Sequence, residues 1–280
     1  MGFLPYVLLV MVPGILLSLW AAYRVRTTYA KWDRVDSGIT MSAFDFARYL
    51  LNAQGLNEVT VEPTPGNLTD HYDPRTRTLR ISTGVAGVAQ RGQPFPMGRG
   101  GGFPSTGYPS TGYPAGRYAP AGLSATGGDP NGIGAADGGR GRLSVSQVAV
   151  IAHEVGHALQ HKTHDPMMAL RQTVVPVAQI GSTLAPWLVI AGVFMHIFGL
   201  AVVGLIFFAG AVAFTFVTLP VEFGASNRAL AFVAPMGMTG DRGAGARDVL
   251  RAAGWTYVAA ALTALLTFAY YLMLVTGSRR

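Results

Sequence analysis

The chain has 280 residues, of which 50% are hydrophobic and only 12% are charged. An ordinary soluble domain carries about 25% charged residues, so this composition is typical of a protein partly embedded in lipid. The net charge of +7 is not gathered into a compact basic cluster with interleaved aromatic residues, which argues against a nucleic-acid partner. Cysteine is absent, which excludes disulfides, a thiolate nucleophile and a cysteine-ligated metal.

Residues 1–23 form the first predicted membrane span. The chain carries no charge from Phe3 to Ala22, and about 20 apolar residues in a helix cross a bilayer core. A cleaved signal peptide would begin with basic residues and end at a small-residue cleavage site. Here the basic residues follow the apolar run, so we expect a retained anchor.

Residues 24–90 are expected to form a cytoplasmic segment with one helix and short strands. Apolar residues recur at helical spacing from Ala43 to Leu51, with Ser42 as a suitable N-cap. Gly55 ends this pattern, which indicates the end of the helix.

Two short strands are predicted after this helix, at Glu58–Glu62 and Thr78–Ser82. Between them, the sequence Asp73-Pro74-Arg75-Thr76 favours a type I turn with proline in second place.

Residues 91–142 differ from the rest of the chain, since nearly half of them are glycine or proline. They contain an imperfect five-residue repeat that begins at Phe103, Tyr108 and Tyr113. Such a segment buries too little apolar surface to offset the entropy of ordering it. We expect a flexible surface insertion; the alternative is a docking loop that displays its tyrosines to a partner.

Residues 143–172 carry the chemistry. Ser144 and Gln147 fit a capping box for a helix that runs to about Gln160. His153 and His157 are four residues apart and share a helix face, so both imidazoles can reach one Zn²⁺. Glu154 lies beside that face, where it suits a general base acting on zinc-bound water. The alternative is a buried helix whose two histidines and glutamate are satisfied by hydrogen bonds.

A catalytic zinc needs a third protein ligand and keeps its fourth position for water. His161 is about 12 Å along the helix axis from His153, too far to share the ion. Glu222 is the predicted third ligand, because two intervening spans return it to the same side of the membrane. Asp165 is the second candidate.

Further predicted spans form a hairpin over residues 174–221 and a fourth helix over residues 252–278. The first run carries no ionisable residue except His196, and we expect the turn at His196–Gly199. Residues 222–251 are expected to form a cytoplasmic segment that supplies the third ligand, with Pro220 opening a helix as the chain leaves the third span.

The distribution of lysine and arginine predicts the orientation. Ten basic residues flank the spans on the side of the polar segments, against Arg279 and Arg280 on the other side. Because cytoplasmic loops are enriched in lysine and arginine, we expect the polar segments in the cytoplasm and both chain ends outside. The predicted fold is mostly α: an integral membrane protein with about four transmembrane helices and a small α+β zincin-like cytoplasmic metallopeptidase domain.

Three segments resemble the YugP-like family of membrane zinc metallopeptidases, which is more loosely related to HtpX-like and CaaX prenyl proteases. They are Asn67–Arg80, Ala152–His161 and Leu219–Ala229. The resemblance implies proteolysis with one Zn²⁺ per chain on His153, His157 and Glu222, and with Glu154 as the catalyst. Related glutamate-zincins often carry an aspartate four residues after the glutamate ligand; here that residue is Ser226, followed by Asn227.

A positioned donor is also needed for the oxyanion of the transition state. His71, Tyr72 and Arg228 are the candidates. The alternative is that His71 and Tyr72 belong to a turn and that Arg228 extends along the membrane interface.

The sequence thus predicts a zinc metalloendopeptidase of the bacterial inner membrane, active at its cytoplasmic surface on peptides or membrane proteins, with a role in quality control. The lipid bilayer is its expected environment, and the sequence carries no signal for an oligomeric state. An intramembrane protease is disfavoured because the predicted spans contain no aspartate to serve as a ligand. The alternative from another class is a membrane scaffold in which the metal motif is a relict and the insertion binds partners.

Overall fold

The computed structural model describes residues 3–87 and 142–277 of the chain. This part is mostly helical, with one small sheet. Its helices are α1 Phe3–Tyr6, η1 Val7–Met11, α2 Val12–Trp32, α3 Ala43–Ala53, α4 Val145–Lys162, α5 Pro166–Phe194, α6 Phe198–Val233, η3 Ala234–Met236 and α7 Gly240–Gly277. Its strands are β1 Thr60–Thr64, β2 His71–Asp73 and β3 Thr78–Ser82.

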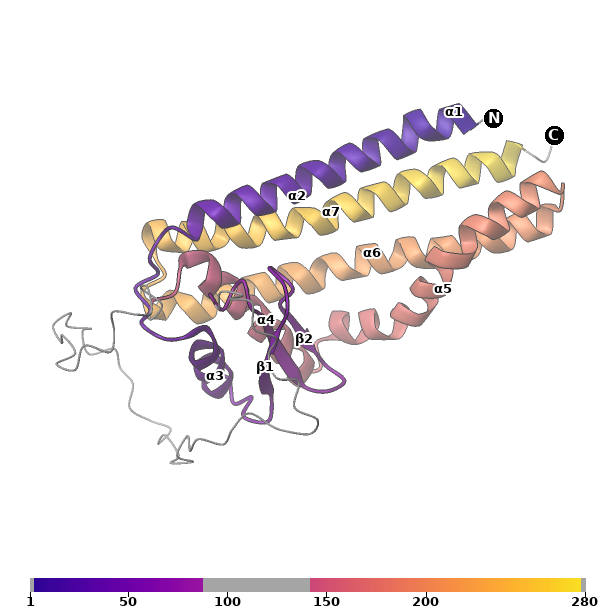
Figure 1. Cartoon of the computed structure of the whole chain (residues 1–280). Helices are drawn as coiled ribbons and strands as arrows, with labels where there is room; N and C mark the ends of the chain where they lie inside the picture. The colour runs from indigo at the N-terminus through magenta and orange to yellow at the C-terminus, as the bar shows by residue number, and fades with distance from the viewer. Residues whose placement is uncertain (1–2, 88–141, 278–280) are drawn as a thin grey trace, which may run out of the picture.

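Four of the described helical stretches are long and apolar enough to cross a membrane: Val7–Trp32, Pro166–Phe194, Phe198–Met236 and Gly240–Gly277. This is the number that the sequence predicts. Figure 1 shows α2 beside α7, and α5 beside α6, in one elongated bundle. Both chain ends lie at the end of the bundle where α5 turns into α6, whereas α3, α4 and the sheet gather at the opposite end.

The membrane helices extend beyond the predicted spans. The prediction that Pro220 opens a new helix is wrong, because α6 passes through Pro220 without interruption. A membrane helix tolerates a proline where neighbouring groups satisfy the freed carbonyl. Residues 222–251 are therefore mostly the end of α6 and the start of α7, joined through η3 and Gly237, whose φ is +85°.

Helix α4 lies at the junction of the bundle and the polar end. Its N-terminus has the predicted capping box, in which Ser144 accepts from the Gln147 backbone N–H and the Gln147 side chain accepts from the Ser144 backbone N–H. The helix contacts α6 and α7 on the bundle side, and α3 and strands β2 and β3 on the other. Most of its residues are buried, and burying an unpaired charge is unfavourable, so few of them are charged.

Helix α3 has the cap and the buried face that the sequence predicts. Ser42 accepts from the Asp45 backbone N–H. The predicted apolar residues all face the core, which they share with α4 and the sheet; they are Ala43, Phe46, Ala47, Leu50 and Leu51.

The sheet has the order β1-β3-β2, with β1 parallel and β2 antiparallel to β3. Strand β3 matches its prediction, and β1 begins two residues later than predicted. Strand β2 was not predicted, because three residues are too few to show an alternating pattern. The predicted turn at Asp73–Thr76 joins β2 to β3, and Arg77 follows it with φ +51°. Strand β2 is thus an edge strand beside α4.

The predicted glycine- and proline-rich insertion, residues 91–142, lies outside the described residues except for Arg142. 

Candidate metal centre

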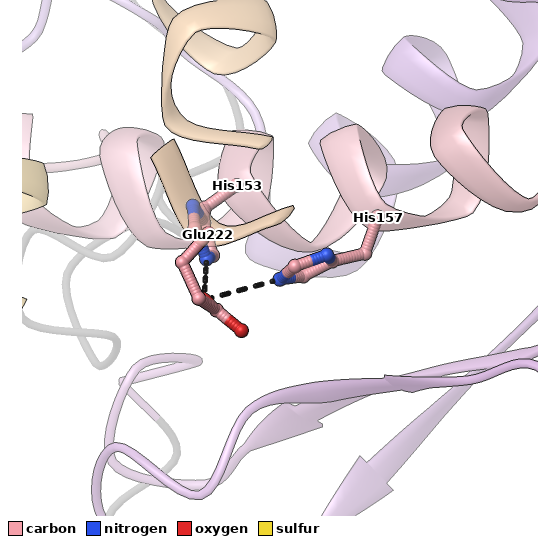
Figure 2. A group of neighbouring side chains, drawn as sticks. All are labelled: His153, His157 and Glu222. Atoms are coloured by element: carbon pink, nitrogen blue, oxygen red, sulfur yellow. Dashed lines mark hydrogen bonds and ion pairs between the residues drawn. The ribbon is translucent and has the colours of Figure 1, made fainter. Parts of the chain in front are cut away.

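Three side chains from two helices meet where α4 crosses α6. His153 and His157 extend from α4, and Glu222 extends from α6 (Figure 2). One carboxylate oxygen of Glu222, Oε2, lies 3.3 Å from His153 Nε2 and 3.5 Å from His157 Nε2. One ligand atom from each residue lies within 4.8 Å of the others. These are the three ligands that the sequence proposes, and the fold brings them together although 64 residues separate His157 from Glu222.

Close contact between α4 and α6 makes this meeting possible. A Cβ placed on Gly156 would lie 2.6 Å from the Ala225 carbonyl oxygen, too near for any side chain. Gly156 precedes His157, and Ala225 is one turn after Glu222. The glycine therefore lets the two backbones approach at the level of the ligands.

The His157 imidazole is fixed by Gln160, one turn further along α4. The Gln160 side-chain amide donates to the Val221 carbonyl at 2.8 Å, so its oxygen is the acceptor that faces His157 Nδ1 at 2.9 Å. His157 therefore carries a proton on Nδ1, and its Nε2 faces Glu222. Both side chains are buried.

His153 has its own partner in Ser226. The Ser226 hydroxyl lies 3.2 Å from His153 Nδ1. Ser226 occupies the place where related enzymes often carry an aspartate, so the serine takes over the contact to the first histidine. Metal-binding histidines normally have such a partner on the second ring nitrogen, and here both do.

This donor set fits a divalent cation. His157 Nε2 and a carboxylate oxygen of Glu222 lie 3.5 Å apart in a buried site, where both atoms could act as ligands of one cation. Two imidazoles and one carboxylate are the ligands that catalytic zinc uses in several peptidases. The residues present therefore suit Zn²⁺.

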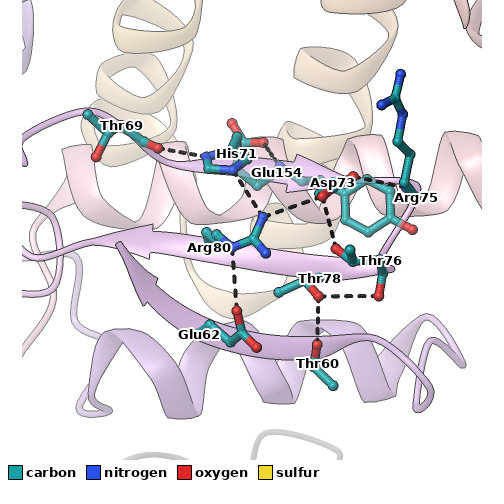
Figure 3. Close-up of polar contacts among 11 residues, drawn as sticks. Thr60, Glu62, Thr69, His71, Asp73, Arg75, Thr76, Thr78, Arg80 and Glu154 are labelled. Carbon is teal, nitrogen blue, oxygen red and sulfur yellow. Dashed lines mark hydrogen bonds and ion pairs between the residues drawn. The ribbon is translucent and has the colours of Figure 1, made fainter. Parts of the chain in front are cut away.

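Glu154 lies next to the two histidines and is held by the edge strand. Its Oε2 accepts from the Tyr72 backbone N–H at 2.9 Å, so strand β2 contacts α4 at this carboxylate (Figure 3). Burial raises the pKa of Glu154, an effect that the neighbouring His153 and His157 oppose. A carboxylate with a raised pKa is a stronger base than an exposed one.

Two further residues near Glu222 were not predicted from the sequence. Arg171 of α5 donates from NH1 to Glu222 Oε1 at 3.2 Å, so the carboxylate oxygen that faces away from the histidines is held by a cation. The Tyr257 phenol of α7 lies near Glu222. Arg171 is the last charge before a long apolar run, a signal that alone suggests only a membrane boundary.

The other candidates from the sequence have partners elsewhere. Arg228 forms an ion pair with Asp165 at 2.8 Å. Asp165, the second candidate for the third metal ligand, is not part of the group formed by His153, His157 and Glu222. The Tyr72 hydroxyl lies 2.9 Å from His161 Nδ1. His71 is exposed on β2 and contacts the Thr69 carbonyl and Arg80 (Figure 3). Among the described residues, Tyr72 is the one of these candidates that bonds to the site, through its backbone N–H to Glu154.

The surroundings of Arg80 form a polar ladder on the outer face of the sheet. Arg80 pairs with Glu62 of β1 and Asp73 of β2, at 3.4 and 3.5 Å (Figure 3). These side chains are partly exposed, and such ion pairs contribute about 0–1 kcal/mol each. The ladder joins the three strands and thereby supports β2 beside Glu154.

Comparisons with known proteins agree with this geometry. Residues 7–90 and 140–276 match the family described as "Putative neutral zinc metallopeptidase". The chain is 32% identical over 264 residues to the "Putative membrane protease YugP" of Bacillus subtilis (strain 168), which covers 94% of this chain and 93% of the relative. No solved structure gives a significant match. The chain therefore belongs to the YugP-like family, whose description is "Putative neutral zinc metallopeptidase".

Proposed function

We propose that this protein is a membrane-anchored zinc metalloendopeptidase with its catalytic centre in a small zincin-like domain. The observation that carries the proposal is the meeting of His153, His157 and Glu222 around a space suited to one cation, with Glu154 beside it. Family membership supports the reaction class.

Each residue of the centre has a role in this reaction. His153, His157 and Glu222 would hold one Zn²⁺. A bound zinc ion lowers the pKa of a water molecule and polarises the carbonyl of the substrate. Glu154 accepts the proton of the attacking water and delivers it to the leaving amine. The Tyr72 N–H holds Glu154 Oε2, which leaves Oε1 to receive that proton.

Arg171 donates to the ligand carboxylate, and Tyr257 lies near it. We assign Arg171 the task of holding Glu222 through Oε1, so that Oε2 would be the oxygen available to a metal. A carboxylate bound through one oxygen leaves a coordination position for water. Tyr257 joins His71, Tyr72 and Arg228 as a candidate donor to the oxyanion of the transition state.

The proposed location is the cytoplasmic surface of the bacterial inner membrane. The four candidate spans and the excess of lysine and arginine at the polar end support this placement. Substrates there are peptides or membrane-protein segments, and the proposed role is quality control of membrane proteins.

The test compares zinc content and peptidase activity in purified protein. Glu154→Gln should keep about one zinc per chain and lose peptidase activity by about 10²–10⁴-fold, because the base is removed and the ligands are retained. His157→Ala should lose the zinc. Glu58→Gln, which removes an exposed glutamate, is the control and should change neither. Full cleavage by Glu154→Gln would refute the proposed mechanism.

A further inference from the structure

We infer that the metal centre lies at the level of the lipid–water boundary, and that its substrates are membrane-anchored polypeptides cut close to the end of a membrane segment. The inference rests on the proposed peptidase function and narrows its substrate class. It depends on the uncharged stretches and the charges that bound them, and on the aromatic and exposed apolar residues near the site.

The charges nearest to the membrane mark a common level on the four long helices. On each helix a single charged residue bounds the apolar stretch at the polar end of the molecule. These residues are Arg24 on α2, Arg171 on α5, Glu222 on α6 and Arg251 on α7. Arg171 and Glu222 are bonded to each other at 3.2 Å inside the metal centre. Two of the four boundary charges are therefore part of the site.

The lengths of the apolar stretches leave little room to place the bilayer elsewhere. The uncharged stretches that these residues bound are 3–23, 172–194, 198–221 and 252–277. At 1.5 Å per residue each stretch spans about 30–40 Å, and the hydrocarbon core is about 30 Å thick. A bilayer that covered the metal centre would include Glu222 and Arg171, whereas one far below it would expose a full turn or more of apolar helix on every span.

Aromatic residues place the interface at the same height. The Trp20 and Trp255 rings lie 5.7 Å apart, and the Arg24 guanidinium lies 5.6 Å from the Trp20 ring centre. Tryptophan with a neighbouring arginine on an exposed helix surface is typical of the headgroup region. Along α7, Trp255 is two residues from Tyr257, which lies near Glu222.

A close contact between α7 and α6 places Glu222 at the same height as the tryptophan pair. A Cβ on Gly254, next to Trp255, would lie 2.9 Å from the Phe223 ring, and Phe223 follows Glu222. The tryptophan pair and the ligand carboxylate thus lie within about one helical turn of each other along the bundle.

Apolar surface continues up to the site itself. Leu170 and Phe223, the chain neighbours of Arg171 and Glu222, are each 44% exposed. Exposed apolar residues at this height suit contact with lipid rather than with bulk water. A polypeptide that leaves the bilayer would therefore meet the metal centre as it emerges.

The depth of the site can be measured without any activity. The chain has no cysteine, so Phe223→Cys and Ile206→Cys each give a single spin-labelling position. Both side chains are exposed, and Ile206 lies in the middle of the α6 span. In vesicles of phosphatidylethanolamine and phosphatidylglycerol, collision with oxygen and with a water-soluble nickel complex should place the Phe223 label in the headgroup region and the Ile206 label in the hydrocarbon. A Phe223 label in bulk water, or as deep as the Ile206 label, would overturn the inference.

The substrate class is tested with one unstructured polypeptide in two forms. The polypeptide is fused to a single membrane helix and reconstituted with the zinc-loaded enzyme in the same vesicles, or it is supplied free in solution. Mass spectrometry should find cuts within about ten residues of the helix end, roughly 30 Å of extended chain. The free form should be cut at least about tenfold more slowly, because anchoring concentrates the substrate at the site. Glu154→Gln should cut neither form.

The outcomes separate this inference from the proposed function. Glu154-dependent cuts spread evenly along the polypeptide, or equal rates for the free and anchored forms, would overturn the substrate class and leave the peptidase in place. No Glu154-dependent cut in either form would overturn the proposed function, and this inference with it.

Discussion

Gln160 shows how one side chain links the metal centre to the packing of the helices. Its oxygen accepts from His157 Nδ1, and its amide donates to the Val221 carbonyl on α6. The same residue therefore orients a ligand and joins the two helices that carry the ligands. Its side chain is only 1% exposed, so neither contact can be replaced by bulk water.

Replacing Gln160 separates these two roles. Gln160→Met should weaken zinc binding by about 10–100-fold, since metal-bound histidines depend on such partners. It should also lower the free energy of unfolding by about 1–3 kcal/mol, because buried polar groups lose their partners. Gln160→Glu keeps an acceptor for His157 but no donor for Val221, so it should restore zinc affinity more than stability.

The measurements are chelator competition for zinc affinity and thermal unfolding in detergent for stability. Gln172→Met is the control, because Gln172 is exposed nearby on α5. Wild-type zinc affinity in Gln160→Met would contradict the role of Gln160 in orienting His157.

Asp165 gives a prediction of pH dependence. Burial raises the pKa of this carboxyl, but the bonds from Arg228 and from the N–H groups of Met168 and Met167 prevail and hold the pKa below its usual value. Asp165→Asn keeps an N-cap for α5 and removes the ion pair. It should destabilise the protein at pH 7 by about 0.5–1 kcal/mol, a small amount because solvent screens the partly exposed arginine.

The sign of the pH effect follows from the lowered pKa. A carboxyl with a lower pKa in the folded state stabilises the fold above its unfolded pKa, which is about 3.9. That stabilisation is lost as the pH falls through the folded pKa. Unfolding midpoints of the two proteins should therefore differ at neutral pH and converge in acid. A difference that stays constant down to acid pH would rule out the ion pair as its cause.

For single site residues, the sequence identifies those that lie close together on one helix. Residues far apart in the chain can be identified only where the membrane topology brings them to the same side. His153, Glu154 and His157 lie within five residues of one helix, so their relation can be read from the helical period. Glu222 could be proposed because two spans return the chain to the same side. Arg171 and Tyr257 have no comparable signal, since their contacts with Glu222 depend on how α5 and α7 pack. Gln160 could have been found from its spacing of three residues from His157.

Among the elements, the crossing of α4 and α6 determines whether the site exists. The two helices approach closely because Gly156 has no side chain to meet the Ala225 carbonyl. Glycine in a helix costs about 1 kcal/mol relative to alanine, so its presence here is explained by the contact rather than by helix propensity.

Gly156→Ala tests this contact. The added methyl group should force α4 away from α6 and separate His157 from Glu222. Overpacking of this kind costs about 1–3 kcal/mol, which should outweigh the gain in helix propensity. We expect a lower thermal unfolding midpoint and a reduced zinc content. Gly199→Ala is the matched control, since a Cβ there meets nothing within 4 Å, and it should bind zinc normally. Normal zinc content in Gly156→Ala would show that the close approach is not required.

Elements with a strong periodic pattern or a long apolar run were predicted well, and those that depend on tertiary contacts were not. The caps at Ser42 and Ser144 and the four long helices follow from local chemistry. Strand β2 is stabilised by pairing with β3 and by the bond from Tyr72 to Glu154, neither of which leaves a pattern in three residues. The interpretation of Pro220 as a helix start was wrong: proline favours the first turn, where no intrahelical N–H bond is needed, but a membrane helix also tolerates proline in its interior.

For the whole molecule, the remaining question is whether residues 91–139 are needed. The family match stops at residue 90 and resumes at residue 140, so these residues lie outside the part of the chain that the family model matches. The described chain on the two sides of the segment meets directly: the Gln147 side chain donates to the Val85 carbonyl at 2.6 Å. A short connection could therefore replace the segment without moving α4 or β3.

Replacing residues 91–139 with a linker of about ten glycine and serine residues should leave zinc content and Glu154-dependent cleavage unchanged. If the segment is flexible, as its composition predicts, the shorter loop should raise the free energy of unfolding by about 1 kcal/mol through the lower cost of loop closure. The scaffold alternative predicts the reverse: shortening the segment abolishes the cellular function, and Glu154→Gln does not. Complementation of a deletion strain with each variant decides between them, because the peptidase requires Glu154 and the scaffold requires the segment.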